Sequence, residues 1–210
     1  MSVKPRAFQG QYPPRWHSII NSPVGRLYVA ASDNALTGIW YEEQAHFPLP
    51  HELGERITDP AGLVAEADEV AQAIGADAER SGEHIYVAPA RILAQTEREL
   101  DEYFRGRRTD FEVPLDPDGT DFQLAVWDYL KTVPYWYTVT YGEISRMVGP
   151  GAPAQAVGQA VGHNKIAIII PCHRVLGAGG KLTGYAGGLD RKRWLLDREE
   201  PKDIRSGRLF

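Results

Sequence analysis

The chain has 210 residues, of which 43% are hydrophobic and 24% are charged, as in an ordinary globular protein. This composition excludes a disordered chain, a collagen-like chain and a coiled coil, and no apolar run approaches the roughly 20 residues that span a bilayer. No apolar stretch follows Lys4 and Arg6, so no secretory signal is expected. We therefore expect a cytoplasmic protein that does not enter membranes.

The charge is distributed unevenly along the chain. The net charge is −5, but residues 1–119 carry 11 basic and 20 acidic side chains, whereas residues 120–210 carry 12 and 8. Such an asymmetry suggests two modules, the second of which can approach an anion. An acidic first half that only keeps the chain soluble explains the same numbers, and charge alone does not decide between the two readings.

The first half has the pattern of an antiparallel sheet followed by helices. Its three predicted strands are rich in β-branched and aromatic residues, and Ser22-Pro23 and Asp33-Asn34 separate them as turn signals. The predicted elements are a flexible arm over 1–15, strands over 16–21, 25–31 and 36–41, a loop over 46–60, a helix over 61–74, a connection over 75–83, a helix over 89–104 that Gly106 ends, and an extended piece over 111–115.

The second half has a helical pattern. The Asp-Pro-Asp-Gly turn at 116–119 predicts a boundary between an N-terminal domain over 1–115 and a C-terminal domain over 116–210. The predicted elements are helices over 120–132, 141–148, 153–163 and 190–198, a loop over 133–138, and a fully buried strand over the apolar run 165–170. Pro153 is expected at the first helical position.

These elements predict an α+β fold. A small N-terminal α/β domain with an antiparallel sheet would precede a mostly helical C-terminal domain with a winged helix-turn-helix. The two helices around the Gly-Pro-Gly turn at 149–151 carry the helix-turn-helix pattern, which also occurs in plain helical bundles.

Cys172 is the single cysteine of the chain, and it follows the predicted buried strand. One cysteine excludes a disulfide framework and a multi-cysteine zinc site, and the six histidines show no ligand spacing, so no metal is expected. A lone buried cysteine is commonly an inert hydrophobe. Here the adjacent His173 favours a reactive thiol, because a nearby imidazole lowers the thiol pKa. A carboxylate near the last helix, Glu199 or Glu200, would orient that imidazole.

The sequence around Cys172 resembles the active-site signature of the O6-alkylguanine-DNA alkyltransferases. The signature reads Ile170-Pro171-Cys172-His173-Arg174-Val175. The resemblance continues, in the expected order and spacing, at Thr140-Tyr141-Gly142-Glu143-Ile144, Ala156-Val157-Gly158, Asn164, Gly184-Tyr185 and Lys192…Leu195-Leu196…Glu199. It covers residues 105–205 strongly and the strands of the first half more weakly.

The resemblance implies a DNA-repair function. Proteins of this family flip an O6-alkylated guanine out of double-stranded DNA and move the alkyl group irreversibly onto a cysteine, so each molecule is a methyltransferase that acts once and is consumed. O4-alkylthymine is a further candidate substrate. No cofactor takes part, and a monomer is expected.

The resemblance also assigns roles in the chemistry. Cys172 accepts the alkyl group, His173 removes the thiol proton through a water, and Glu199 polarises that histidine. Tyr141 protonates the leaving guanine, with Lys192 close to it. Extrusion of the base from the stacked duplex costs a few kcal/mol.

The remaining assigned residues hold the base and connect the elements. Asn164 belongs to a hinge between the recognition helix and the active-site strand. The backbone of Cys172 and Val175, together with Tyr185 and the loop around Ala186, forms the pocket for the flipped base.

Two positions depart from the family pattern. Gln155 stands where the family normally has the arginine that replaces the extruded base, and residues 150–163 contain no Lys or Arg. Glutamine can hydrogen-bond the orphaned partner base but supplies no cation, which puts efficient flipping in doubt. Trp136 stands where a glycine is usual, and it would be strained if the position needs a positive φ. Trp136 is either an exposed surface for stacking on DNA or, as we expect, packed on the domain.

Three other function classes remain as alternatives. The first is a non-catalytic or weakly active sensor of alkylated DNA with the same fold, for which Gln155 leaves room. The second is a helix-turn-helix regulator that signals through an alkylated cysteine, and no extra domain supports it. The third is an unrelated cysteine hydrolase, which needs turnover and suits a buried nucleophile less well.

Overall fold

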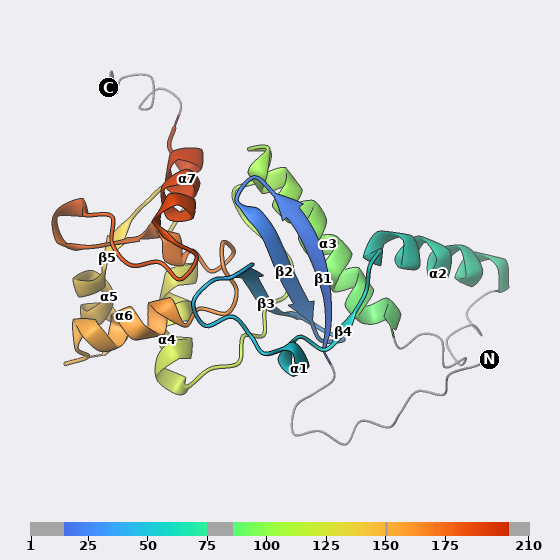
Figure 1. Ribbon diagram of the computed structural model, residues 1–210, viewed down its shortest axis with the longest axis horizontal. Helices are drawn as coiled ribbons and strands as arrows, with labels where there is room; N and C mark the ends of the chain where they lie inside the picture. Colours follow the sequence, from blue (N-terminus) through green and yellow to red (C-terminus); the bar gives the residue numbers. More distant parts are fainter. Residues whose placement is uncertain (1–14, 75–85, 150, 202–210) are drawn as a thin grey trace.

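The computed structural model describes residues 15–74, 86–149 and 151–201, and it places a sheet with its helices beside a mostly helical part (Figure 1). This arrangement confirms the predicted α+β class. The predicted N-terminal arm, except for Arg15, and the predicted connection over 75–83 lie outside the described residues.

The sheet has four strands in the order β3-β2-β1-β4. β1 spans Trp16–Ser22, β2 spans Gly25–Ala31, β3 spans Leu36–Tyr41 and β4 spans Glu55–Arg56. The first three form the predicted antiparallel meander, whereas β4 pairs in parallel with β1. The loop predicted over 46–60 is therefore wrong in part, since it contains β4 and helix α1 (Pro50–Leu53). Both elements are too short to show a periodic pattern in the sequence.

Two helices accompany the sheet, and both lie close to their predicted bounds. α2 spans Pro60–Ile74 and α3 spans Val87–Phe104. α3 packs on β1 and β2 (Figure 1), and its side chains Leu93, Leu100 and Tyr103 are fully buried. Gly106 takes a φ of 71° just after α3, which is the glycine stop that the sequence predicts.

The helical part contains the predicted helix-turn-helix. Its elements are α4 (Asp121–Lys131), β5 (Val139–Thr140), α5 (Tyr141–Val148), α6 (Ala154–Gly162), the short 3-10 helices η3 (Cys172–Arg174) and η4 (Ala178–Gly180), β6 (Val175–Leu176) and α7 (Leu189–Glu199). Thr140 caps α5 by accepting a hydrogen bond from the Glu143 amide. Pro153 is the N-cap of α6 and not its first residue, because its ψ of 139° is extended. Within the described part of the chain, no helix is both long and apolar enough to cross a membrane.

The apolar run over 165–170 is buried as predicted, but it is not a strand. Only Ile166 forms a bridge, to Ile39 of β3, and Ile168 then takes a φ of 72° that turns the chain back. The Ile170 amide donates to the Ile166 carbonyl at 3.0 Å, which closes the turn. A run of apolar residues indicates that a segment is buried but not which way its backbone runs. The sequence therefore predicted the burial of residues 165–170 correctly but not the turn that they form.

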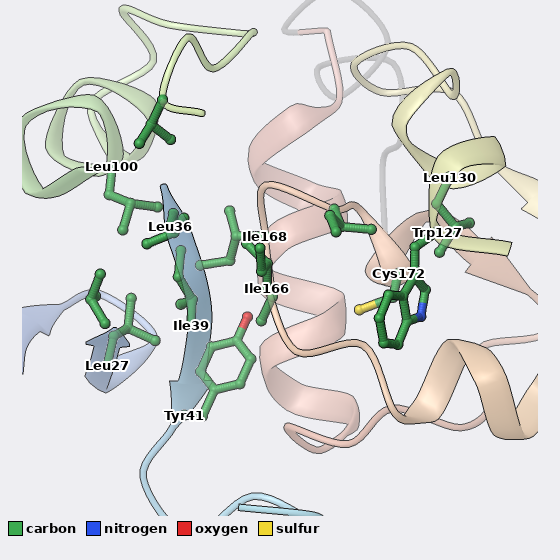
Figure 2. Packing of buried hydrophobic residues seen from close by; sticks show 14 of the residues in the cluster. Leu27, Leu36, Ile39, Tyr41, Leu100, Trp127, Leu130, Ile166, Ile168 and Cys172 are labelled. Atoms are coloured by element: carbon green, nitrogen blue, oxygen red, sulfur yellow. The ribbon is translucent and has the colours of Figure 1, made fainter. Parts of the chain in front are cut away.

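One hydrophobic core joins the sheet to the helical part. Figure 2 shows Leu36, Ile39 and Tyr41 of β3 facing Ile166 and Ile168, with Cys172 on the far side of this segment beside α4. The division into domains at residue 115 remains a prediction.

Candidate active site

Cys172 lies at the start of η3, and its side chain is buried beside Trp127 of α4 (Figure 2). The turn over 165–170 delivers it there, and the Cys172 amide donates to the Ile170 carbonyl at 2.8 Å. The sulfur faces Asn164, whose Nδ2 donates to Sγ at 3.1 Å. The thiol is therefore held by a hydrogen bond inside the protein.

Asn164 holds the turn that carries the cysteine. Its Nδ2 also contacts the carbonyl oxygens of Ile170 at 2.8 Å and Ile166 at 3.3 Å, and its Oδ1 accepts from the Ile166 amide at 3.1 Å. Because Asn164 follows the end of α6 by two residues, one buried side chain connects that helix to Cys172.

His173 is fully buried and pairs with Glu199, the last residue of α7. The distance between Nε2 of His173 and Oε1 of Glu199 is 2.8 Å. An ionised carboxylate only accepts hydrogen bonds, so Nε2 carries the proton and Nδ1 has a free lone pair. Nδ1 is buried and has no hydrogen-bond partner among the described residues. Nδ1 is thus the basic atom of this pair, and Glu199 rather than Glu200 orients the imidazole.

Other donors surround the same carboxylate. Oε1 of Glu199 accepts from Tyr103 Oη at 2.8 Å and from Arg174 Nη2 at 2.9 Å, and Oε2 accepts from Arg174 Nε at 2.8 Å and the Trp136 amide at 3.1 Å. Burial acts to raise the pKa of Glu199, but His173 and Arg174 outweigh it and hold the pKa well below its usual range. Glu199 is therefore a permanent buried anion.

Burial dominates the protonation of both reactive groups. It raises the pKa of the Cys172 thiol, although the hydrogen bond from Asn164 and the charge of Lys192 oppose it. The depressed thiol pKa that the sequence predicted is therefore wrong for the free protein. Burial also lowers the pKa of His173, against the opposing pull of Glu199. The resting site contains a neutral thiol and a neutral imidazole, so the thiolate has to form by proton transfer during the reaction.

Lys192 and Tyr141 meet at one carbonyl. Nζ of the fully buried Lys192 donates to the carbonyl oxygens of Val175 at 2.5 Å, Thr183 at 2.6 Å and Gly184 at 3.1 Å. Tyr141 Oη approaches the same Gly184 oxygen at 3.5 Å. Burial lowers the pKa of Lys192 to about 8 and raises the pKa of Tyr141. Tyr141 thus keeps its proton at neutral pH, as a proton donor must.

A pocket of about 190 Å³ lies between α6 and the loop before α7. It is lined by Ala45, His46, Tyr141, Gly158, Val161, Gly162, Gly184, Tyr185 and Ala186. Tyr141, Tyr185 and Ala186 are thus brought together as predicted, whereas Cys172, Val175 and Gln155 are not part of the lining. Within the described residues, no cluster of three His, Cys, Asp or Glu side chains is arranged to hold a metal ion.

Two family descriptions match the chain. The DNA binding domain of 6-O-methylguanine DNA methyltransferase matches residues 121–201, and the ribonuclease-like domain of the same family matches residues 63–117. A methylated-DNA–protein-cysteine methyltransferase of Mycobacterium tuberculosis H37Rv is 40% identical over 183 residues, which make up 87% of this chain and 91% of that protein. The chain belongs to the 6-O-methylguanine DNA methyltransferase family.

Further relatives of this family agree. A crystal structure of Mycobacterium tuberculosis OGT in complex with DNA has a TM-score of 0.67 and 40% identity, and the match covers 90% of this chain and 97% of that one. A crystal structure of Mycobacterium tuberculosis O6-methylguanine methyltransferase has a TM-score of 0.66 and 38% identity, with coverage of 91% and 98%. A methylated-DNA–protein-cysteine methyltransferase of Methanosarcina acetivorans is 50% identical over 114 residues, 54% of this chain and 73% of that protein.

The two departures from the family pattern have different structural consequences. Gln155 is exposed in the first turn of α6, so its side chain is not packed in the core. Trp136 has a φ of 65°, so the strain predicted for a non-glycine residue is present. The packing expected for its side chain is wrong, because Trp136 is 38% exposed and lies against Tyr137, which is 58% exposed.

Several site residues carried no signal that could have revealed them in the sequence. Tyr103 looks like one more core residue on the inner face of α3, yet its hydroxyl reaches a carboxylate 96 positions away. Ala45 and His46 lie in the predicted loop over 46–60 or directly before it, and only the three-dimensional fold brings them to the family's pocket. Arg174 is part of the motif around Cys172, but nothing in the sequence predicted that its guanidinium would bind the Glu199 carboxylate.

Proposed function

We propose that this chain repairs alkylated DNA. In one irreversible turnover it moves the alkyl group from O6 of a guanine in duplex DNA to Sγ of Cys172, without a cofactor. The relatives that carry the name methylated-DNA–protein-cysteine methyltransferase support this activity, and the relative solved in complex with DNA supports a DNA substrate. The observation that carries the proposal is the buried Cys172, whose sulfur accepts a hydrogen bond from Asn164 and whose neighbour in the chain, His173, pairs with Glu199. Tyr185, which also acts on the thiol, belongs to the lining of the pocket.

The thiol is activated only when a substrate is present. Its proton passes to Nδ1 of His173 through a water, and the permanent charge of Glu199 stabilises the imidazolium that forms. The Asn164 hydrogen bond and the charge of Lys192 stabilise the thiolate. Because the resting thiol is neutral, it resists other electrophiles until the base is bound.

The transfer itself is a displacement at carbon. The C–S bond forms as the C–O6 bond breaks, and the electron pair of the broken bond remains on the guanine. Tyr141 donates a proton to the guanine and regains one from solvent, while His173 releases the thiol proton to solvent. Over the whole reaction the sulfur therefore loses one proton and the base gains one. Such a displacement requires the base to be held in line with Sγ, and the pocket lined by Tyr141 and Tyr185 is the space that would hold it.

The wider setting belongs to the same proposal. The base enters the pocket by flipping out of the duplex, with α6 as recognition helix and Gln155 beside the gap. The protein acts as a monomer in the cytoplasm, where a single free cysteine stays reduced. Residues 1–115 and 116–210 are its two domains.

Intact-mass measurement tests the proposed function directly. The chain is mixed with a duplex that contains one O6-methylguanine, and the mass should rise by one methyl group per chain in a stoichiometric reaction. Cys172→Ser should show no added mass while it still binds the duplex. If the unaltered chain binds the duplex without gaining mass, the proposal is contradicted. That result would favour the alternative of a non-catalytic sensor of alkylated DNA, which Gln155 alone supports.

A further inference from the structure

The pocket has a wall from the N-terminal part of the chain. Ala45 and His46 follow β3, and they line the pocket together with Tyr185 and Ala186 of the loop before α7. The Ala45 amide donates to the Ala186 carbonyl at 3.1 Å, so the two loops are joined by a backbone hydrogen bond. Part of the substrate pocket is therefore built by the sheet-bearing half of the molecule.

The segment that carries His46 is held in a defined shape. Oε1 of Gln44 accepts from the Tyr41 amide at 2.8 Å, which turns the chain away from the end of β3. His46 itself has a φ of 59°, a conformation that few non-glycine residues adopt. Its imidazole stacks on that of His163, with 4.0 Å between ring centroids and 25° between the planes. Both imidazoles are exposed, so the stack and the backbone conformation are what hold the His46 ring in position.

A second cavity lies on the other side of this ring. It also measures about 190 Å³, and its lining includes Trp40, Gln44 and Asn164. Among the described residues that line either cavity, His46 and Gly162 line both. Because Gly162 has no side chain, the imidazole of His46 is the side chain that separates the two spaces.

The second cavity borders the residue that holds the acceptor sulfur, because Asn164 is part of its lining. Asn164 follows His163 directly, and its Nδ2 contacts the sulfur that receives the alkyl carbon. Each cavity alone is smaller than the roughly 300–1,000 Å³ of typical ligand pockets, so a large substituent on O6 has little room. Removal of the ring would join the two cavities and extend the pocket toward Asn164.

We propose that His46 is a specificity-determining residue: its imidazole closes the pocket toward the second cavity and limits the size of the O6-substituent that the protein accepts. The inference rests on the proposed function and adds a role for the N-terminal half beyond support of the fold. It predicts that small substituents react well and that bulky aromatic ones react slowly.

The test compares two matched variants on two substrates. His46→Asn removes the ring at a position of positive φ, which asparagine tolerates well. His163→Asn breaks the same ring stack and removes a ring from the second cavity's lining, but it leaves the His46 ring in place between the two spaces. Rates of alkyl transfer are measured by intact mass with duplexes that contain O6-methylguanine or O6-benzylguanine. His46→Asn should raise the benzyl-to-methyl rate ratio by roughly tenfold, the scale at which pocket size discriminates substrates. His163→Asn, which only loosens the His46 ring, should raise the ratio much less.

The outcomes separate this inference from the proposed function. An unchanged ratio in His46→Asn, or an equal increase in both variants, overturns the role of His46 as a partition while methyl transfer by the unaltered chain still stands. No methyl transfer by the unaltered chain overturns the proposed function itself. Thermal unfolding of both variants identifies any general loss of structure, and His46→Gly, which also suits the positive φ, provides a second removal of the ring.

Discussion

Glu199 receives hydrogen bonds from residues that lie far apart in the chain. Tyr103 comes from α3, Trp136 from the segment before β5, and His173 and Arg174 from η3. A buried carboxylate is tolerable only when its charge is compensated, and these donors supply that compensation. Each further hydrogen bond to Glu199 also weakens the electrostatic stabilisation that its carboxylate gives to a protonated His173. The basicity of His173 therefore depends on a tyrosine from the other half of the molecule.

Tyr103→Phe should shift the pH dependence of alkyl transfer. Loss of one donor to Oε1 leaves more negative charge for the imidazolium, so the pKa of His173, which burial holds below 6.5, should rise. His173 accepts a proton only when it is neutral. The acidic limb of the rate profile should therefore move to higher pH, with a loss of rate below pH ~6.5 and little change at pH ~8.

Tyr135→Phe is the matched control for this shift. Tyr135 Oη donates to the Arg198 carbonyl at 3.3 Å and not to Glu199, while its ring, which phenylalanine retains, lies under Arg174. Rate profiles against pH, measured by methyl transfer to Cys172, compare the two variants. Identical shifts in both, or a shift of Tyr103→Phe to lower pH, would show that Tyr103 acts only through packing.

At the scale of elements, the segment before β5 combines a necessary contact with a strained backbone. The Trp136 amide donates to Glu199, and the φ of 65° that allows this contact suits glycine and not tryptophan. The Trp136 side chain contributes little packing energy to offset this strain, because it is 38% exposed. The contact to the site thus depends on the backbone of residue 136 and not on its indole.

Trp136→Gly should stabilise the protein. Relief of the positive-φ strain, of order 1 kcal/mol or more, should exceed the loss of a partly exposed ring, so the free energy of unfolding should rise by roughly 0.5–1 kcal/mol. Urea unfolding measures the change. Tyr137→Gly serves as the control, because Tyr137 has no positive φ and its replacement should destabilise the segment. Equal destabilisation by both substitutions would show that the indole contributes more than the strain costs.

The sequence predicted elements well where local chemistry decides them. Period-two alternation between turn signals located β1 to β3, and the glycine after α3 located the end of that helix. The run over 165–170 was misread because its side chains report burial, whereas its direction depends on Asn164 and on a positive φ at Ile168. Motif resemblance located Cys172, His173 and Glu199, but no local pattern indicates that Tyr103 or His46 reaches the site.

At the scale of the molecule, the two halves form one site. Tyr41 Oη and Tyr185 Oη are 2.8 Å apart, and Arg191 of α7 donates to the Val24 carbonyl while it lies over the Tyr41 ring. These contacts attach the loop before α7 and α7 itself to the sheet. The hydrogen bond from Tyr103 of α3 to Glu199 is another link between the two halves. The acidic first half thus supports the site, and we expect contact with phosphates from the second half, with its 12 basic and 8 acidic residues.

The distribution of charge leads to a prediction about α6. DNA binding should weaken with salt by about 0.9 log units per log unit of salt for each phosphate contact. The described residues of α6 include no Lys or Arg, so this helix contributes less to the salt dependence than a helix with an arginine would. Gln155→Arg should steepen the slope by roughly one contact and should speed repair of duplex O6-methylguanine. It should have little effect on transfer from the free alkylated base, because that substrate needs no flipping.

Gln159→Arg is the matched control, since it adds the same charge one turn later on the same exposed face of α6. Both variants should bind duplex DNA with a steeper salt dependence, but only Gln155→Arg should repair it faster, because only residue 155 is expected beside the gap left by the flipped base. Binding is measured by titration at several salt concentrations, and transfer is measured by intact mass with duplex and free base. If Gln155→Arg accelerates both substrates equally, or neither, residue 155 does not occupy the extrusion site. If both variants accelerate duplex repair alike, added charge alone explains the gain, and extrusion depends on another part of the molecule.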